Sequence, residues 1–179
     1  MSADKIRQLS PEVANCLAAG EVVGRPANAF KELLENAFDA GATKVRVSIS
    51  GGGVDSLIVE DNGDGISKND LLLAPLRYAT SKLAVVDDLS SLYTYGFRGE
   101  ALASVAAVSR LNVVSCLKNS SDAHKLTRLD GGVGDWFVEP DQRSHGTTVE
   151  VFDLFYNTPA RRKFLRSAQT EFKNIEVVF

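Results

Sequence analysis

The sequence predicts an α+β protein, a two-layer sandwich with helices on one face of a mostly antiparallel sheet. Helical patterns occupy the chain up to about residue 40, and patterns of short strands occupy much of the rest. Strands joined by short turns pair antiparallel, whereas parallel neighbours need a crossover connection that is usually a helix. Helices grouped first and strands grouped afterwards are typical of α+β proteins rather than of a doubly wound parallel sheet.

Two helices are expected before the first strand. Ser10-Pro11-Glu12 has the pattern of a helix start, with Ser as the N-cap and Pro at the first helical position, and Gly20 should end this short helix. Arg25-Pro26 begins a longer helix to about Ala40, which Gly41 can cap. Apolar residues at helical spacing should form its buried stripe, namely Phe30, Leu33, Leu34 and Ala37.

A predicted hairpin follows the long helix. Residues 44–50 alternate polar and apolar side chains, with Val45, Val47 and Ile49 on one face, which indicates a half-buried strand. Residues 51–53 are glycines that turn the chain, and residues 57–60 form the returning strand. Further strands are expected at about 111–117, 125–130 and 147–154, with 136–138 as a candidate for one more. Further helices are expected at about 69–77, 99–105 and from Thr158-Pro159 onward.

Composition restricts the class of protein. A chain of 179 residues with 44% apolar and 24% charged residues fits one soluble globular domain, or the larger part of a two-domain piece. The net charge of -3 gives no general attraction to nucleic acid, so DNA contact would need a local patch. Cys16 and Cys116 lack metal-ligand spacing, which favours reduced thiols. No apolar run approaches the ~18 residues of a membrane span, so an intracellular protein is expected.

Glu32 and Asn36 are the first candidate site residues. They stand four apart within the long predicted helix and therefore share a face. The carboxylate can take a proton from water, and the carboxamide oxygen can bind a hard cation. Such pairs are also common on ordinary solvated helix surfaces, so later motifs must decide between the two interpretations. Glu35 is left out of the catalytic set because Lys31, four residues earlier, explains it as a surface ion pair.

Two later motifs favour a nucleotide site. Asp61-Asn62-Gly63-Asp64-Gly65 follows a strand, and its first carboxylate can accept a hydrogen bond from an exocyclic amine. An ordinary turn is the alternative for this motif. Gly96-Phe97-Arg98-Gly99-Glu100-Ala101-Leu102 places two glycines before a helix, whose N-terminus can cradle phosphate. Neither G-x-x-x-x-G-K-[ST] nor G-x-G-x-x-G occurs, which disfavours P-loop ATPases and Rossmann dehydrogenases.

In this order the motifs resemble the nucleotide-binding motifs of the GHKL ATPases, which include DNA gyrase, the Hsp90 chaperone, histidine kinases and MutL. Four blocks narrow the resemblance to the MutL family of DNA mismatch repair proteins. They lie at residues 18–23, 79–82, 96–102 and 153–163. The resemblance extends from about Ile6 to the end of the chain and implies a Bergerat-type sandwich, with nucleotide bound between helices and sheet. The other GHKL classes are the alternatives.

The resemblance implies a role for each candidate residue. It assigns Glu32 as the catalytic base and Asn36 as the ligand of the Mg²⁺ that bridges the phosphates. It assigns Asp61 to the adenine amino group, which gives ATP specificity, and Thr147 as a link between that carboxylate and the base, directly or through water. Asp39 would help to line the pocket, although an ordinary polar residue near a helix end is an equal alternative.

The family's ATP lid corresponds to residues 67–102. Thr80, Ser81 and Lys82 offer hydroxyls and an ammonium group to phosphates. The remaining residues assigned to nucleotide binding are Gly65, Gly96, Phe97, Arg98, Gly99, Glu100, Ala101 and Leu102. Together these assignments imply a Mg²⁺-dependent ATPase.

At the level of the whole protein, the resemblance implies a switch. ATP would drive association with a second copy or with a MutL paralogue, hydrolysis would reset it, and the cycle would couple mismatch recognition by a MutS-family protein to downstream repair. The family also has a second domain, which supplies a phosphate-contacting lysine, and a C-terminal dimerisation domain. Residues 1–179 are therefore expected to be one ATP-binding domain with weak hydrolysis. The compartment would be the nucleus in a eukaryote and the cytoplasm in a bacterium.

A binding module is the alternative of a different class. Arg161-Arg162-Lys163 and Arg166 form a local basic cluster that could contact DNA phosphate. Such a run is more often an ordinary solvated helix face. If the DNA interpretation holds, the chain would act mainly by binding DNA or repair partners, with little hydrolysis.

Overall fold

The computed structural model describes residues 14, 18–19, 22–77, 79, 100–129 and 134–179 of the chain. The strands are β1 (Val45–Ser50), β2 (Ser56–Asp61), β3 (Arg110–Cys116), β4 (Ala123–Arg128), β5 (Trp136–Asp141) and β6 (Gly146–Phe152). The helices are α2 (Pro26–Asp39), the 3-10 turn η1 (Gly51–Gly53), α3 (Lys68–Leu73), α4 (Ala101–Ala107), α5 (Pro159–Phe164) and α6 (Ala168–Val178). The start of the first expected helix and Cys16 lie outside the described residues.

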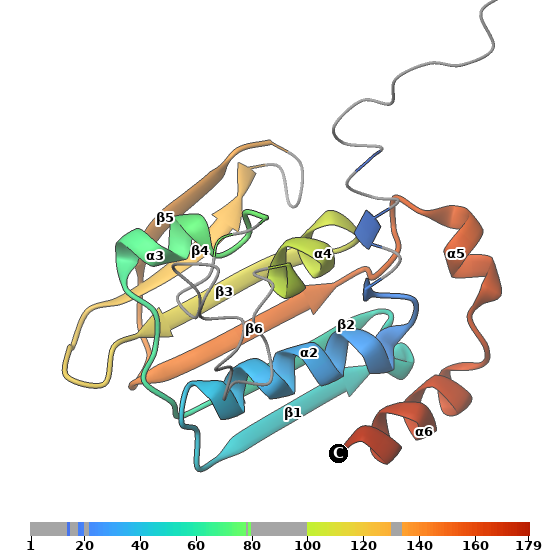
Figure 1. Ribbon diagram of the computed structural model, residues 1–179, viewed down its shortest axis with the longest axis horizontal. Coiled ribbons are helices and arrows are strands. Elements are labelled where there is room, and N and C mark those ends of the chain that lie inside the picture. Colours follow the sequence, from blue (N-terminus) through green and yellow to red (C-terminus); the bar gives the residue numbers. More distant parts are fainter. Residues whose placement is uncertain (1–13, 15–17, 20–21, 78, 80–99, 130–133) are drawn as a thin grey trace, which may run out of the picture.

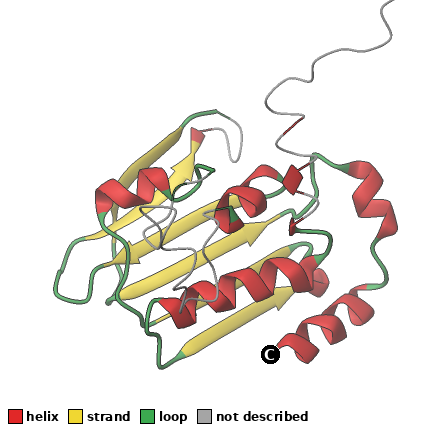
Figure 2. Ribbon diagram, in the orientation of Figure 1, coloured by secondary structure: helices red, strands yellow, loops and turns green. Residues whose placement is uncertain are grey.

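The strands form one six-stranded sheet in the order β1-β2-β6-β3-β4-β5, and all the described neighbours are antiparallel. Helices α2, α3 and α4 lie on one face of this sheet, with α6 beside α2 (Figure 1). Figure 2 shows the same two layers by secondary structure, with the other sheet face free of described helices. The predicted α+β sandwich is confirmed. Among the described residues, no helix is both long and apolar enough to cross a membrane.

Helix α2 forms where its sequence signals coincide. Pro26 occupies the first helical position, and the Arg25 N–H donates to the Asn28 side chain at 3.1 Å. At the other end, Ala42 donates to the Ala37 carbonyl and Gly41, at φ 70°, donates to Phe38, which is a Schellman motif. The predicted stripe is confirmed as buried core, since its exposed fractions are Phe30 0%, Leu33 2%, Leu34 8% and Ala37 2%.

Alternation along the central strands supplies the other half of the core. The rows directly opposite one another across β2, β6 and β3 are Leu57, Val151 and Leu111, and Val59, Val149 and Val113. All six side chains are buried and belong to the same cluster as the α2 stripe. The helix-facing side of these strands is therefore fixed by register, because a slip of one residue would turn every apolar side chain outward.

Two expectations about helices are wrong. Helix α3 ends at Leu73, before the expected residue 77. The final segment is two helices rather than one, because Ser167 begins α6 by accepting a hydrogen bond from the Thr170 N–H at 3.3 Å.

The buried Glu171 carboxylate accepts from the Arg166 N–H at 2.9 Å and lies 3.7 Å from the Arg25 guanidinium. That distant arginine helps to hold α6 against α2.

Candidate functional site

Three strand ends meet at one end of the sheet. Strand β2 ends at Asp61, β3 ends at Cys116, and β6 begins at Gly146, which pairs with Cys116. The C-terminus of α2 reaches the same place, where the Asp64 N–H donates to the Ala40 carbonyl at 2.9 Å. Both layers of the sandwich therefore converge on the loop that contains the Asp-Asn-Gly motif.

The Asp61 carboxylate is anchored through one oxygen. Its Oδ1 accepts the Gly63 N–H at 2.8 Å and the Thr147 N–H at 3.2 Å. The hydrogen bond to Gly63 closes a local turn, which was the alternative interpretation of this motif. The hydrogen bond to Thr147 links the carboxylate to β6. Both described bonds go to Oδ1, so Oδ2 retains its capacity to accept a hydrogen bond from a ligand.

Burial has the largest effect on the ionisation of Asp61. It raises the pKa of the carboxyl, while the Gly63 and Thr147 N–H groups and the Arg143 charge act in the opposite direction. The carboxylate is therefore partly desolvated at the sheet end, where hydrogen bonds to a ligand are stronger than in water.

Ser115 is a site residue that the sequence analysis missed. Its side chain is buried, and its Oγ lies 2.9 Å from Thr147 Oγ1, directly across the strand pair. The same Oγ donates to the Gly146 carbonyl at 3.0 Å and accepts the Ile66 N–H at 2.8 Å. A hydroxyl has one proton, so this arrangement makes Thr147 the donor to Ser115 and leaves Thr147 Oγ1 as an acceptor.

Asp61, Thr147 and Ser115 share the helix-facing side of the sheet. Each stands two residues from a core valine of its own strand, and side chains two apart in a strand point the same way. The polar cluster therefore continues the rows of core side chains at the point where the apolar core ends.

Two glycines let the strand ends approach closely. Gly65 has φ 78°, and a Cβ there would overlap the Cys116 carbonyl oxygen. Gly146 has φ 106°, and a Cβ there would overlap the Asp61 carbonyl oxygen. Both conformations are ones that side chains rarely adopt. The close approach of Gly65 is thus to the β3 backbone of the protein itself, while its predicted contact with a nucleotide stays a prediction.

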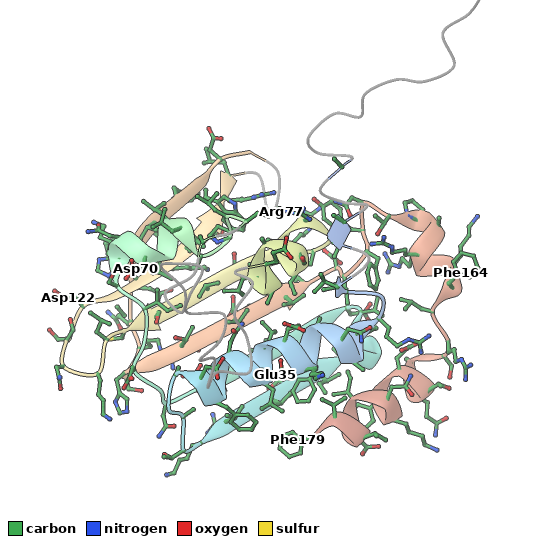
Figure 3. All side chains as sticks on the ribbon, in the orientation of Figure 1. Glu35, Asp70, Arg77, Asp122, Phe164 and Phe179 are labelled. Atoms are coloured by element: carbon green, nitrogen blue, oxygen red, sulfur yellow. The ribbon has the colours of Figure 1, made fainter. Side chains whose placement is uncertain are left out.

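Glu32 and Asn36 lie one turn apart on α2, as their spacing predicts, and both are half-buried beside the core stripe. Asp39, in the last turn of α2, is also half-buried. Glu35, whose position on α2 is labelled in Figure 3, forms the expected ion pair, with 3.7 Å between its carboxylate and the Lys31 ammonium. The expected surface ion pair of Glu35 is therefore confirmed, while the catalytic role of Glu32 stays a prediction.

Much of the predicted lid lies outside the described residues, namely Thr80, Ser81, Lys82, Gly96, Phe97, Arg98 and Gly99. The end of the lid motif is described. Glu100 precedes α4, which begins at Ala101, and Leu102 packs against the core. The expected helix after the two glycines is confirmed, while phosphate binding by these residues stays a prediction.

The donor set suits a metal bound together with a nucleotide. Among the described residues, no group of three or more His, Cys, Asp and Glu side chains could hold a metal by itself. Mg²⁺ is commonly held by one or two protein oxygens with phosphates and waters, and the Asn36 carbonyl oxygen is of this kind. Asn36 therefore fits Mg²⁺ that arrives with a phosphate ligand.

A separate hollow lies at the opposite end of the sheet. Its volume is about 350 Å³, and its lining includes Asn112 and the ion pair between Arg110 and Asp153, whose atoms are 3.1 Å apart. None of the predicted nucleotide residues lines it. The hollow is thus distinct from the polar cluster at Asp61.

Comparison with known proteins adds independent information. Residues 25–147 match a family described as histidine kinase-, DNA gyrase B-, and HSP90-like ATPase. The chain is 52% identical over 174 residues to the DNA mismatch repair protein MutL of Cellvibrio japonicus, and 50% identical over 173 residues to that of Escherichia coli. Each alignment covers 97% of this chain and 28% of the relative, so the chain spans under a third of these proteins.

Solved structures agree in fold. The N-terminal domain of a DNA repair protein matches with a TM-score of 0.74 and 29% identity, over 92% of this chain and 46% of that one. The Aquifex aeolicus MutL ATPase domain complexed with ADP matches with a TM-score of 0.64 and 30% identity, over 88% of this chain and 54% of that one.

Proposed function

Because the chain belongs to the histidine kinase-, DNA gyrase B- and HSP90-like ATPase family, and within it to the MutL mismatch repair proteins, we propose that it binds ATP with Mg²⁺ and hydrolyses it. The site is the end of the sheet at Asp61, beneath the C-terminal half of α2. A MutL relative of known structure has been solved with ADP, which supports an adenine nucleotide as the ligand.

The pairing of Asp61 with Thr147 carries the proposal. The carboxylate Oδ2 and the Thr147 hydroxyl oxygen are both available as acceptors on the helix-facing side of the sheet. The exocyclic amine of adenine has two N–H donors, whereas guanine has a carbonyl oxygen at that position. A guanine oxygen would meet acceptors only, so the site selects adenine.

The proposed chemistry is carried by α2. Asn36 would hold Mg²⁺ together with phosphates and waters, and the metal would supply charge neutralisation at the phosphates. Glu32, one turn earlier, orients the attacking water and accepts its proton. Asp39 and Gly65 line the pocket, and residues 80–82 and 96–102 contact the phosphates.

We also propose that ATP binding drives pairing with a second copy or with a MutL paralogue, and that this switch couples mismatch recognition to repair. The support is the identity to MutL proteins across 97% of the chain. A MutS-family protein is the proposed upstream partner, because mismatch repair requires a protein that recognises the mismatch.

Calorimetric titration with a non-hydrolysable ATP analogue tests the site, with and without Mg²⁺ and with a GTP analogue as comparison. We expect Mg²⁺-dependent binding of the adenine nucleotide only, and loss of that binding in Asp61→Asn. Asp64→Asn is the matched control, because Asp64 is exposed in the same loop and loses the same charge. Equal binding of both nucleotides, or no binding by a folded chain, would overturn the proposal.

A DNA-binding role is the second candidate. Helix α5 buries none of its residues, and Arg161, Arg162 and Lys163 lie in its last turn beside the exposed Phe164 (Figure 3). Binding through phosphate contacts falls steeply with salt. Filter binding of duplex DNA at two salt concentrations should therefore separate wild type from a variant with all three basic residues changed to Gln. Equal, salt-insensitive binding by both proteins would exclude this cluster.

A further inference from the structure

Arg143, in the loop between β5 and β6, uses two guanidinium nitrogens on the strands around Asp61 and the third on its own loop. Its Nη2 donates to the Asp61 carbonyl oxygen at 2.9 Å. Its Nη1 donates to the Val114 carbonyl oxygen at 3.0 Å and to Thr148 Oγ1 at 2.8 Å, and its Nε donates to the Ser144 carbonyl oxygen at 2.9 Å. One half-buried side chain therefore joins β2, β3 and β6.

These contacts lie where the regular pairing of β2 with β6 ends. The described register stops at Glu60 and Thr148. At the next residue, the Thr147 N–H donates to the carboxylate of Asp61, while the carbonyl of Asp61 accepts from Arg143. The guanidinium thus holds the backbone of the residue whose side chain is turned toward the proposed base.

Arg143 reaches this point from the side of the sheet away from α2. Thr148, which accepts one of its hydrogen bonds, neighbours the core residue Val149 and therefore points to the opposite face. The carboxylate of Asp61 lies on the helix-facing side, where the nucleotide is proposed to bind. Arg143 is consequently behind the site, and it would not itself touch the base.

The charges around Arg143 reinforce this arrangement. Burial lowers the pKa of Arg143, and the carboxylates of Asp61 and Glu60 oppose that effect. In return, the Arg143 charge lowers the pKa of Asp61 against the effect of burial, together with the N–H groups of Gly63 and Thr147.

We propose that Arg143 is a positioning residue for base recognition, because it fixes the Asp61 backbone and so directs the carboxylate at the exocyclic amine of adenine. The inference rests on the proposed function of Asp61 in adenine binding. A guanidinium suits this role because its planar fork spans several acceptors at once, whereas an ammonium is a point charge.

The test measures binding of ATP and GTP analogues, both with Mg²⁺, over a range of pH, for wild type, Arg143→Met, Arg143→Lys and Arg46→Met. We expect Arg143→Met to weaken binding of the ATP analogue by roughly tenfold or more, as for loss of hydrogen bonds to a charged group. The preference of Arg143→Met for the ATP analogue over the GTP analogue should be smaller than that of wild type. As the pH is lowered, this variant should lose binding at a higher pH than wild type does. Arg143→Lys should restore the pH profile and recover affinity only in part.

Arg46→Met is the matched control. Arg46 lies on the same open face of the sheet, is 79% exposed, and is 3.9 Å from the Glu60 carboxylate, but none of its described contacts reaches the strand ends. It should match wild type in affinity, selectivity and pH profile. Thermal unfolding of every variant shows whether each protein is folded at the assay temperature.

The outcomes separate two failures. If folded wild type binds neither analogue, the proposed function itself is wrong. If wild type prefers the ATP analogue and Arg143→Met shows the same affinity, selectivity and pH profile, the inference is overturned. If Arg143→Met does not fold, Arg143→Lys decides in its place, and wild-type affinity and selectivity in that variant would overturn the inference.

Discussion

The hydroxyl groups of Ser115 and Thr147 lie 2.9 Å apart across the pair of β3 and β6, where the apolar core ends. Because the Ser115 proton goes to the Gly146 carbonyl, this contact fixes Thr147 as donor to Ser115 and as acceptor toward the site. One buried serine therefore sets the hydrogen-bonding character of the residue beside Asp61.

Removing that hydroxyl should affect both stability and binding. Ser115→Ala leaves the Ile66 N–H without its side-chain acceptor and frees Thr147 Oγ1 to rotate. We expect a loss of about 1–3 kcal/mol in the free energy of unfolding and weaker binding of the ATP analogue. Urea denaturation and calorimetry measure the two effects. Ser48→Ala, at an exposed position of β1, is the control and should change neither.

The contact of Gly65 with β3 predicts that a side chain at this position lowers the free energy of unfolding by more than its backbone conformation alone explains. Gly65→Ala combines a φ of 78° with overlap of the Cys116 carbonyl, whereas Gly41→Ala has a φ of 70° and nothing within 4 Å. We expect the Gly41 variant to lose about 1–2 kcal/mol of unfolding free energy and the Gly65 variant to lose more than about 3 kcal/mol. Equal losses in denaturation curves would show that β3 yields to the new methyl group.

The raised pKa of Asp61 predicts how the free energy of unfolding should depend on pH. When a carboxyl has a higher pKa in the folded protein than in the unfolded chain, its protonated form favours folding. This contribution is fully present below the pKa of the unfolded chain, and it is lost as pH rises through the pKa of the folded protein. Asp61→Asn cannot ionise, so its stability relative to wild type should increase over that interval, by at most about 1.4 kcal/mol per pH unit.

Urea denaturation of wild type and Asp61→Asn at a series of pH values measures this difference. The exposed Asp64→Asn variant controls for loss of a charge in the same loop. A difference that stays constant with pH, or that falls as pH rises, would contradict the raised pKa. The expected result would mean that Asp61 costs stability at neutral pH and is kept for binding.

The sequence predicted best those elements whose signals are local. For α2, the proline at its start, the apolar stripe and Gly41 all indicate the same boundaries, and the structure confirms them. The break between α5 and α6 was missed because the Ser167 cap acts together with Glu171, whose partner Arg25 is distant in sequence.

The polar cluster shows the same limit at the candidate site. Asp61 was identified from its motif, and its neighbour Thr147 from the family resemblance. Ser115 and Arg143 belong to no motif, since a serine in a strand and an arginine in a loop are common. Their contacts depend on β6 lying between β2 and β3, which is a property of strand order and not of any local pattern.

The two glutamates of α2 provide the sharpest test of the proposed chemistry. Glu32→Ala should keep binding of the ATP analogue but slow hydrolysis by roughly 10² to 10⁴, because a positioned general base contributes about that factor. Glu35→Ala removes the same group from the same helix, where the carboxylate pairs with Lys31 at 3.7 Å. It should bind and hydrolyse ATP as wild type does.

Steady-state phosphate release, with binding measured separately, distinguishes the possible results. Loss of binding in Glu32→Ala would mean that this residue supports the pocket rather than the chemistry. Equal turnover in both variants would remove Glu32 from the mechanism. Loss of turnover in Glu32→Ala but not in Glu35→Ala would identify Glu32 as the base, on the side of α2 that also carries Asn36. The Asn36→Ala variant should then bind nucleotide equally with and without Mg²⁺.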